Sequence, residues 1–270
     1  MLFVLIIGIG TNLSVSQMQI DKPIFRKTLK KKTISEVYYQ SLNFSNEHLP
    51  VGDTKTQSKI KKTLATHHYN NLQTTKLHTK AQEWFPIIEP ILKQYGIPKD
   101  FRYMPLVESG LRSGTSSKGA SGHWQFMPQT ARDFGLRVNL NVDERKDMRK
   151  STIAACKYLK FLYSEFKSWT LAAAAYNGGE GSVKRQIIQH NHKNYFKMTL
   201  NAETASYVYK LIAMKEIIEN PSLHGYKSNV DTNSKQGLEL VPATSNTQKA
   251  VLNFSVEGEV GPLLLASESF

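Results

Sequence analysis

One carboxylate in the chain, Glu108, stands in surroundings that an ordinary solvated glutamate lacks. Apolar residues recur at helical spacing between residues 101 and 107, and Ser109 and Gly110 end the run. The sequence therefore predicts that Glu108 lies in the last turn of a short, largely apolar helix. The negative end of the helix dipole and the apolar neighbours both favour the protonated acid. A carboxylic acid that is protonated near neutral pH can act as a general acid.

The segment after Glu108 predicts a wall opposite this acid. Small residues at 119–122 allow the backbone a close approach, and Gln125 supplies both a hydrogen-bond donor and an acceptor. Trp124 and Phe126 offer flat apolar faces of the kind that bind sugars, although a Trp near a Phe is also a common core pattern.

A second polar pair, Tyr176 and Asn177, follows an alanine-rich run at 169–175, which predicts a helix buried on most sides. Gly178 and Gly179 stop this helix, so that the pair can project from its end. A phenol and an amide there suit the acetamido group and hydroxyls of an amino sugar. Taken alone, however, an Asn-Gly-Gly helix stop is usually just a cap.

Asp143, Glu144 and Asp147 are candidates for a second catalytic carboxylate. The basic neighbours of Asp143, Glu144 and Asp147 indicate ion pairs and a helix start instead. In the helix expected over 202–219, Glu203 lies four residues from Tyr207, so both share a face that could reach the site.

Four motifs occur in order between residues 108 and 208: ESGL at 108–111, GASGHWQFMPQTA at 119–131, AAAAYNGGEG at 172–181 and ETASYV at 203–208. Together they resemble the soluble-type lytic transglycosylases of glycoside hydrolase family 23, and most of all the membrane-bound lytic murein transglycosylase D branch. The resemblance covers roughly residues 76–221. His123 and the Gly179-Glu180 pair depart from the family's usual pattern.

The resemblance implies a peptidoglycan lytic transglycosylase, which cleaves the MurNAc-GlcNAc β-1,4 bond without water and leaves 1,6-anhydro-MurNAc ends. Glu108 would protonate the departing oxygen and then remove the proton from the sugar's 6-hydroxyl, so no metal or cofactor is expected. The resemblance also implies that the glycan groove is lined by Ser109, Gln125, Tyr176, Asn177 and Tyr207. Two other functions stay open: a hydrolytic lysozyme of the goose type, and a non-catalytic peptidoglycan-binding or scaffold protein.

The expected fold is all-α and lysozyme-like, with helices packed around the alanine-rich one and only minor strand content. Pro86 and Pro90 are expected to kink or split the apolar helix that starts near residue 81. Cys156, the single cysteine, falls on the buried stripe of another helix and reads as a small core residue. A further helix over 182–189 is expected to turn Val183, Ile187 and Ile188 inward.

The amino-terminal part predicts export to the periplasm or cell envelope. The apolar run at 2–9 is too short to span a bilayer, and small residues follow it, so residues 1–16 read as a signal peptide cut after Ser16. A buried strand is the alternative interpretation of this run.

Basic charge is concentrated ahead of the motifs. Residues 17–80 hold twelve Lys or Arg and four Asp or Glu, a net of +8 out of +13 for the whole chain. Residues 17–75 are therefore interpreted as a basic, partly flexible arm, which is either simply solvated or faces anionic wall polymers and an anionic membrane surface. No nucleic-acid-binding motif is recognisable, so nucleic acid is not an expected partner. Residues 222–270 form a tail of unknown role, in which alternation at 252–257 hints at a strand.

Overall fold

The computed structural model describes residues 34–50, 52–68, 75–110 and 112–226. The expected signal peptide, the start of the basic arm and the strand expected at 252–257 lie outside the described residues. In the described part, no helix combines the length and apolar character that crossing a membrane requires.

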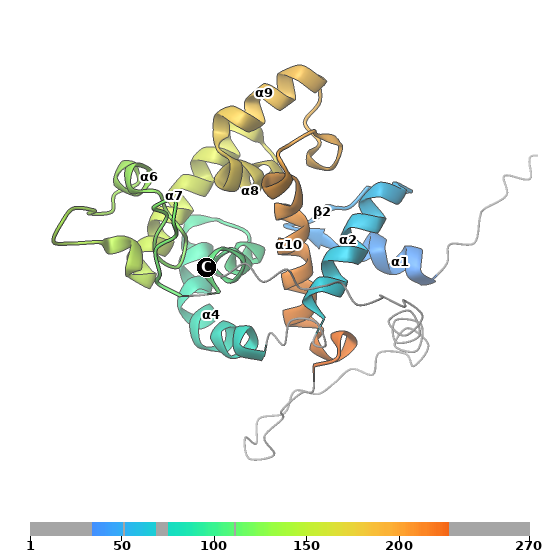
Figure 1. Cartoon of the computed structure of the whole chain (residues 1–270), viewed down its shortest axis with the longest axis horizontal. Helices are drawn as coiled ribbons and strands as arrows, with labels where there is room; N and C mark the ends of the chain where they lie inside the picture. The colour runs from blue at the N-terminus through green and yellow to red at the C-terminus, as the bar shows by residue number, and fades with distance from the viewer. Residues whose placement is uncertain (1–33, 51, 69–74, 111, 227–270) are drawn as a thin grey trace, which may run out of the picture. The chain divides into compact units, whose positions relative to one another are not determined.

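The predominantly helical fold expected from the sequence is confirmed (Figure 1). Within the described ranges the only sheet is a two-stranded antiparallel hairpin, β1 (Asn43–Phe44) and β2 (Glu47–His48), with Phe44 opposite Glu47. The helices in chain order are α1 (Ile34–Ser41), α2 (Thr54–His67), α4 (Thr75–Tyr95), η1 (Lys99–Tyr103), α5 (Met104–Ser109), α6 (Pro128–Asp133), η2 (Glu144–Lys146), α7 (Met148–Phe166), α8 (Trp169–Gly178), α9 (Glu180–His190), η3 (Tyr195–Lys197), α10 (Ala202–Glu219) and η4 (Pro221–His224).

Helix α8 lies at the centre of the packing, as its alanine run predicts. Leu171 and Ala172–Ala175 are fully buried, and α8 packs against α7, α9 and α10. Small side chains let these helices approach closely. At Gly178 the approach is so close that a Cβ atom would lie 2.3 Å from the Thr204 hydroxyl on α10. The alanine-rich run thus brings the carboxyl end of α8 against the start of α10.

Helix α4 is one helix from Thr75 to Tyr95, so of the two expected effects of Pro86 and Pro90, a kink or a split, the split does not occur. The two prolines are four residues apart on the exposed side, and the opposite side carries Ile88 and Leu92 into the core. The burial of this apolar side against α7 compensates for the missing backbone hydrogen bonds.

The packed part of the chain begins well ahead of residue 76, inside the segment interpreted as a flexible arm. Phe44 and Ile60 are fully buried, and α2 packs along α10. Glu47 also binds the first turn of α8, where it accepts hydrogen bonds from Ser168 Oγ (2.8 Å) and the Thr170 backbone N–H (3.1 Å). Few apolar residues occur in this segment, but they are spaced to face the core. The average composition of the segment therefore does not predict that it packs.

Two other expectations concern single side chains. Cys156 is buried in α7, which confirms its interpretation as a core residue. Ile188 was expected to face inward, but it is 80% exposed, so that prediction is wrong. Val183 supplies the fully buried contact of α9, and Ile188, five residues later, falls on the other side of the helix.

Candidate active site

Glu108 lies where the sequence predicts, in the last turn of the six-residue helix α5. Pro105 occupies the first turn, and Gly110 ends the helix in the left-handed conformation with φ of 59°. The backbone N–H of Gly110 donates to the carbonyl of Leu106 at 3.1 Å. The proline start and the glycine stop hold this short helix at a length that leaves Glu108 on its last turn.

The Glu108 carboxyl is bound by Tyr207 of α10, whose Oη donates to Oε1 at 2.5 Å. Burial is the main influence on this carboxyl, and it raises the pKa of Glu108 to about 7. The Tyr207 hydrogen bond and the charge of Lys210 oppose the rise, whereas the charge of Glu203 adds to it. The side chain can therefore exist as an acid or as a carboxylate near neutral pH.

Tyr176 lies at the end of α8, and its hydroxyl donates to the backbone carbonyl of Trp124 at 2.8 Å. Burial, and next the negative charge of Glu108, raise the pKa of Tyr176 well above its ordinary value. The pKa of Tyr207 is raised for the same two reasons. Both phenols therefore stay neutral beside Glu108.

Asn177 is held between α8 and α10. Its Oδ1 accepts from the Thr204 hydroxyl at 3.1 Å, and its Nδ2 donates to Glu203 Oε1 at 3.4 Å. Gly179, with φ of 84°, ends α8 directly after Gly178. Both oxygen and nitrogen of the amide thus have assigned partners, which fixes the orientation of the side chain.

We call residues 114–126 the wall loop. Gln125 sits in it with φ of 47°, and its Nε2 donates to the carbonyls of Gly122 (2.8 Å) and Gly114 (3.1 Å). Ser109 connects α5 to the loop, because its Oγ lies 3.0 Å from the carbonyl oxygen of His123. The loop therefore meets α5 and α8 through its own backbone carbonyls.

Trp124 and Phe126 do not form a flat sugar-binding surface. Trp124 is fully buried, with Nε1 donating to Thr152 Oγ1 on α7 at 2.9 Å, and Phe126 is 2% exposed. The core alternative left open by the sequence is the correct one. The tight turn of the wall loop directs these rings onto the domain interior.

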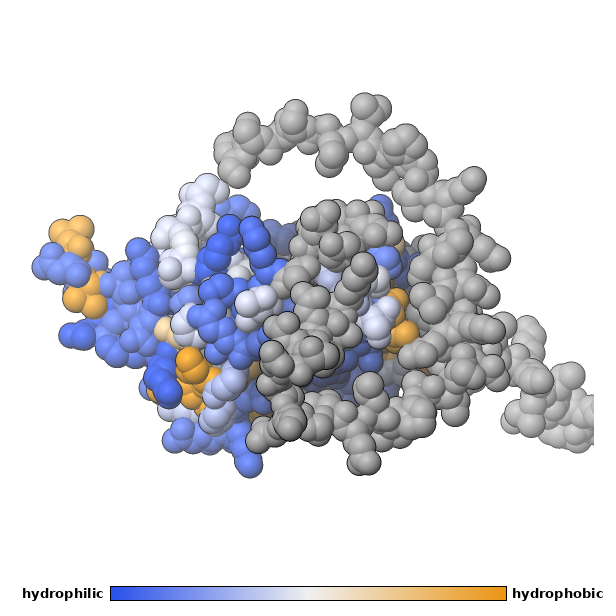
Figure 2. Space-filling model, turned by 90° about the horizontal axis from the view of Figure 1, so that it is seen from below, coloured by the Kyte–Doolittle hydropathy of each residue, from blue (hydrophilic) through white to orange (hydrophobic). Residues whose placement is uncertain are grey.

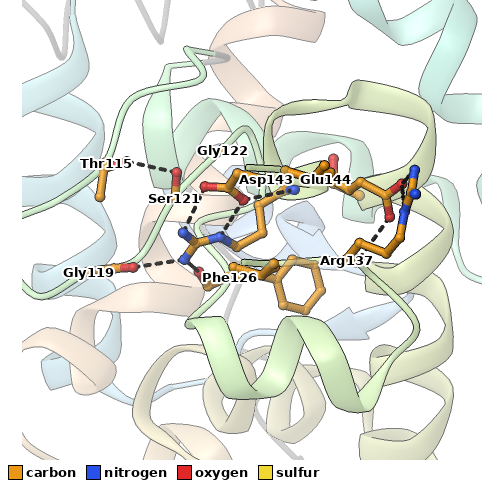
Figure 3. Close-up of polar contacts among 12 residues, drawn as sticks. Thr115, Gly119, Ser121, Gly122, Phe126, Arg137, Asp143 and Glu144 are labelled. Carbon is orange, nitrogen blue, oxygen red and sulfur yellow. Dashed lines mark hydrogen bonds and ion pairs between the residues drawn. The ribbon is translucent and has the colours of Figure 1, made fainter. Parts of the chain in front are cut away.

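The acidic residues near 145 form ion pairs and caps, as their neighbours predict (Figure 3). Asp143 pairs with Arg145 at 2.8 Å, and Asp147 caps α7. Glu144 pairs with Arg137 at 2.7 Å and with Lys150 at 2.8 Å, and these two cations lower its pKa to about 2. None of the three is available as a second acid.

The structure brings the six predicted site residues into one connected cluster. Tyr207 binds Glu108, Ser109 follows it in the chain, and Tyr176 and Gln125 meet the wall loop. Asn177 joins through α8 and α10. Sequence reasoning missed the Glu203–Asn177 contact and the burial of Arg145, which is 6% exposed, because a buried arginine has no sequence pattern that separates it from a surface one. In the described ranges, no three His, Cys, Asp or Glu side chains gather as a metal site.

Comparisons with known proteins find similar sequences for the part of the chain that carries the motifs. Residues 86–199 match the family model of the transglycosylase SLT domain. Membrane-bound lytic murein transglycosylase D from Escherichia coli K12 is 32% identical over 154 residues, which are 55% of this chain and 34% of that protein, and the protein of the same name from strain O6:H1 matches equally. A putative tributyltin chloride resistance protein from Alteromonas sp. strain M-1 is 34% identical over 116 residues, which cover 42% of this chain and 56% of that protein.

One solved structure, an inactive mutant of the lytic transglycosylase Slt from Pseudomonas aeruginosa, matches with 20% identity and a TM-score of 0.40. The match covers 62% of this chain and 30% of that one. The chain spans about a third of the length of its transglycosylase D relatives. The resemblance inferred from the motifs is confirmed, because residues 86–199 are similar to the transglycosylase SLT domain.

Proposed function

We propose that this chain, with its SLT domain, is a peptidoglycan lytic transglycosylase in which Glu108 is both the acid and the base. The observation that carries the proposal is the largely buried Glu108 carboxyl, with its pKa raised to about 7 and one oxygen held by Tyr207. The family match and the names of the E. coli relatives support the substrate class.

In the first step, Glu108 gives its proton to the glycosidic oxygen between MurNAc and GlcNAc. Its Oε1 already accepts from Tyr207, so the proton is carried by Oε2. The bond from the MurNAc C1 to that oxygen breaks, and the protonated oxygen leaves with GlcNAc. The N-acetyl oxygen of MurNAc stabilises the positive charge at C1.

In the second step, the Glu108 carboxylate takes the proton from the 6-hydroxyl of the same MurNAc. The 6-oxygen bonds to C1 and closes the 1,6-anhydro ring. Glu108 is then protonated again, so the cycle closes without water. Tyr207 supports the mechanism because its hydrogen bond stabilises the carboxylate between the two steps.

The surroundings of the acid favour a one-carboxylate reaction. Hydrolytic glycosidases ordinarily use a second carboxylate as nucleophile or base. Among the described residues, Asp143 and Glu144 are engaged in ion pairs, and Glu203 is 61% exposed in its side chain and bonded by Asn177. These engagements support a mechanism in which the substrate's own groups complete the chemistry.

We also propose that the predicted set, Ser109, Gln125, Tyr176, Asn177 and Tyr207, surrounds the bound glycan. Their contacts suggest different roles. Tyr176 and Tyr207 direct their protons at protein acceptors: Tyr207 orients Glu108, and Tyr176 holds the wall loop at Trp124. Gln125 keeps its Oε1 as an acceptor for a sugar hydroxyl or amide, because only its Nε2 is engaged by loop carbonyls.

We propose an envelope location, in the periplasm or at a membrane surface. The membrane-bound E. coli relatives and the wall substrate support it. The basic residues ahead of the SLT domain would face anionic wall polymers or phospholipid head groups.

The reaction type is tested by mass spectrometry of the soluble products that the purified chain releases from peptidoglycan. The proposal predicts muropeptides one water lighter than those of a hydrolytic lysozyme. Products at the hydrolytic mass would replace it with the lysozyme function. Tight binding with no release, under conditions in which a lysozyme digests the same sample, would favour the scaffold function.

A further inference from the structure

Arg145, in η2, is a buried arginine whose hydrogen bonds reach the wall loop. It is 6% exposed, and its Nε and Nη2 each donate to one carboxylate oxygen of Asp143 at 2.8 Å. Its Nη1 donates to the carbonyls of Gly119 (2.9 Å) and Phe126 (3.0 Å) (Figure 3). One guanidinium therefore joins two points of the loop that are seven residues apart.

The backbone of Arg145 also contacts the loop. Gly122 has φ of 80° and packs so closely on the Arg145 carbonyl that a Cβ atom would lie 1.9 Å from that oxygen. Ser121 and Phe126 exchange two backbone hydrogen bonds of 3.1 Å across the same turn. The segment 119–126 is thus a closed turn built directly on Arg145.

The opposite side of this turn meets the candidate active site. The carbonyl of His123 lies 3.0 Å from Ser109 Oγ, next to Glu108 in the chain. The carbonyl of Trp124 accepts from Tyr176. A shift of the turn would therefore displace the partners of both side chains, and the amide of Gln125 with them.

We propose that Arg145 is a positioning residue that holds the wall loop in place for the bound glycan strand. It contributes to glycan binding and not to proton transfer at Glu108. The inference rests on the proposed function. Arginine suits the task because its planar fork can bind a carboxylate with two nitrogens and still direct the third at backbone carbonyls. Lysine has one nitrogen and cannot form this set.

The test compares the wild type with Arg145→Lys in the full chain, by hydrogen exchange of the 114–127 backbone and by steady-state kinetics on soluble glycan strands. The expected results are faster exchange at Ser121, Gly122 and Phe126 and a KM about tenfold higher, equivalent to about 1.4 kcal/mol. The kcat value is expected to stay within about threefold of the wild type, with an unchanged pH profile.

Arg137→Lys is the matched control. Arg137 pairs with Glu144 in the same ionic cluster, and its side chain is 69% exposed. We expect unchanged hydrogen exchange of the wall loop and an unchanged KM for this variant.

Asp143→Asn is a second probe. It keeps Arg145 but weakens the ion pair that holds its guanidinium, and we expect a smaller rise in KM than for Arg145→Lys. If Arg145→Lys does not fold, this variant decides the question by the same two readouts.

Unchanged exchange and KM in a folded Arg145→Lys variant would overturn the inference. A fall in kcat with a shifted pH profile would also overturn it, because it would place the effect on Glu108. A wild type that releases no products would instead refute the proposed function, and the exchange data would still report whether Arg145 orders the loop.

Discussion

At Glu108, two opposing influences set the protonation state. Burial favours the neutral acid, and the Tyr207 hydrogen bond favours the carboxylate. The outcome, a pKa of about 7, suits a group that must give a proton and then take one back. Neither influence alone would give this pKa. Burial alone would raise the pKa of Glu108 so far that release of the proton is hindered. The Tyr207 hydrogen bond alone would leave Glu108 ionised at neutral pH, like a solvated carboxylate.

Tyr207→Phe is expected to move the pH profile of cleavage to higher pH. The Tyr207 hydrogen bond lowers the pKa of Glu108, so its removal raises that pKa, and the acid form persists further into the alkaline range. Turnover at the optimum should fall, roughly 10- to 100-fold, because the carboxylate loses the donor that supports it. A kcat/KM profile against pH measures both effects. An alkaline limb that moves to lower pH would contradict the account.

Glu108→Gln should stabilise the fold at alkaline pH relative to the wild type. The folded-state pKa of about 7 exceeds the ordinary value of 4.5. The unfolded chain therefore ionises first as pH rises, and wild-type stability declines from about pH 4.5 through pH 7. The glutamine of the variant cannot ionise. The free energy of unfolding of the variant, relative to that of the wild type, should therefore rise by about 1–3 kcal/mol between pH 4 and pH 8.5. Urea unfolding at both pH values measures it, and a shift of opposite sign would refute the buried-acid description.

The sequence could predict the place of Glu108 but not all its partners. The apolar run, the proline and the glycine stop define α5 locally. Tyr207 lies 99 residues away in the chain, and only its motif connected it with the site. Trp124 shows the limit of such reasoning, because the choice between core and sugar surface depends on how the whole loop turns.

Among the elements, the wall loop depends on glycines at two positions with positive φ but different surroundings. Gly122 has φ of 80° and touches the Arg145 carbonyl, whereas Gly119 has φ of 86° and open space where a Cβ atom would lie. A comparison of substitutions at these two glycines therefore separates the cost of backbone strain from the cost of steric contact. The sequence shows both glycines, but not which of them is packed.

Gly119→Ala should cost roughly 1–2 kcal/mol of stability from backbone strain alone. Gly122→Ala should cost roughly 1–3 kcal/mol more, because its Cβ must also displace the Arg145 backbone. Chemical denaturation of the two variants measures the difference. Equal losses would show that the close contact between the loop and η2 does not matter for stability.

At the scale of the whole molecule, described residues ahead of the segment that matches the SLT family model belong to the same packed core. The family match begins at residue 86, yet α2 and the β1–β2 hairpin pack into the same core, with Phe44 and Ile60 fully buried. The composition of residues 17–75 predicted a basic arm, because charged residues dominate the average composition of that segment. Burial instead depends on a few apolar residues, whose contacts with α10 come from a distant part of the chain. The described surface visible in Figure 2 is mostly hydrophilic, with a few small apolar patches.

Ile60→Ala should therefore destabilise the protein by about 2–5 kcal/mol, as expected for a fully buried isoleucine. Ile188→Ala, the matched change on the exposed side of α9, should stay within about 0.5 kcal/mol of the wild type. Urea unfolding midpoints compare the two. Similar small effects at both sites would mean that residues 34–68 do not belong to the cooperative core.

The central claim is that the Glu108 proton cleaves the glycan. The most direct measurement compares the rate at which wild type and Glu108→Gln release soluble fragments from peptidoglycan, with circular dichroism and glycan binding checked in both. The account predicts a folded variant that still binds glycan and cleaves at least about 10²- to 10⁴-fold more slowly, the contribution expected of a general acid. A folded variant that cleaves at the wild-type rate would contradict it.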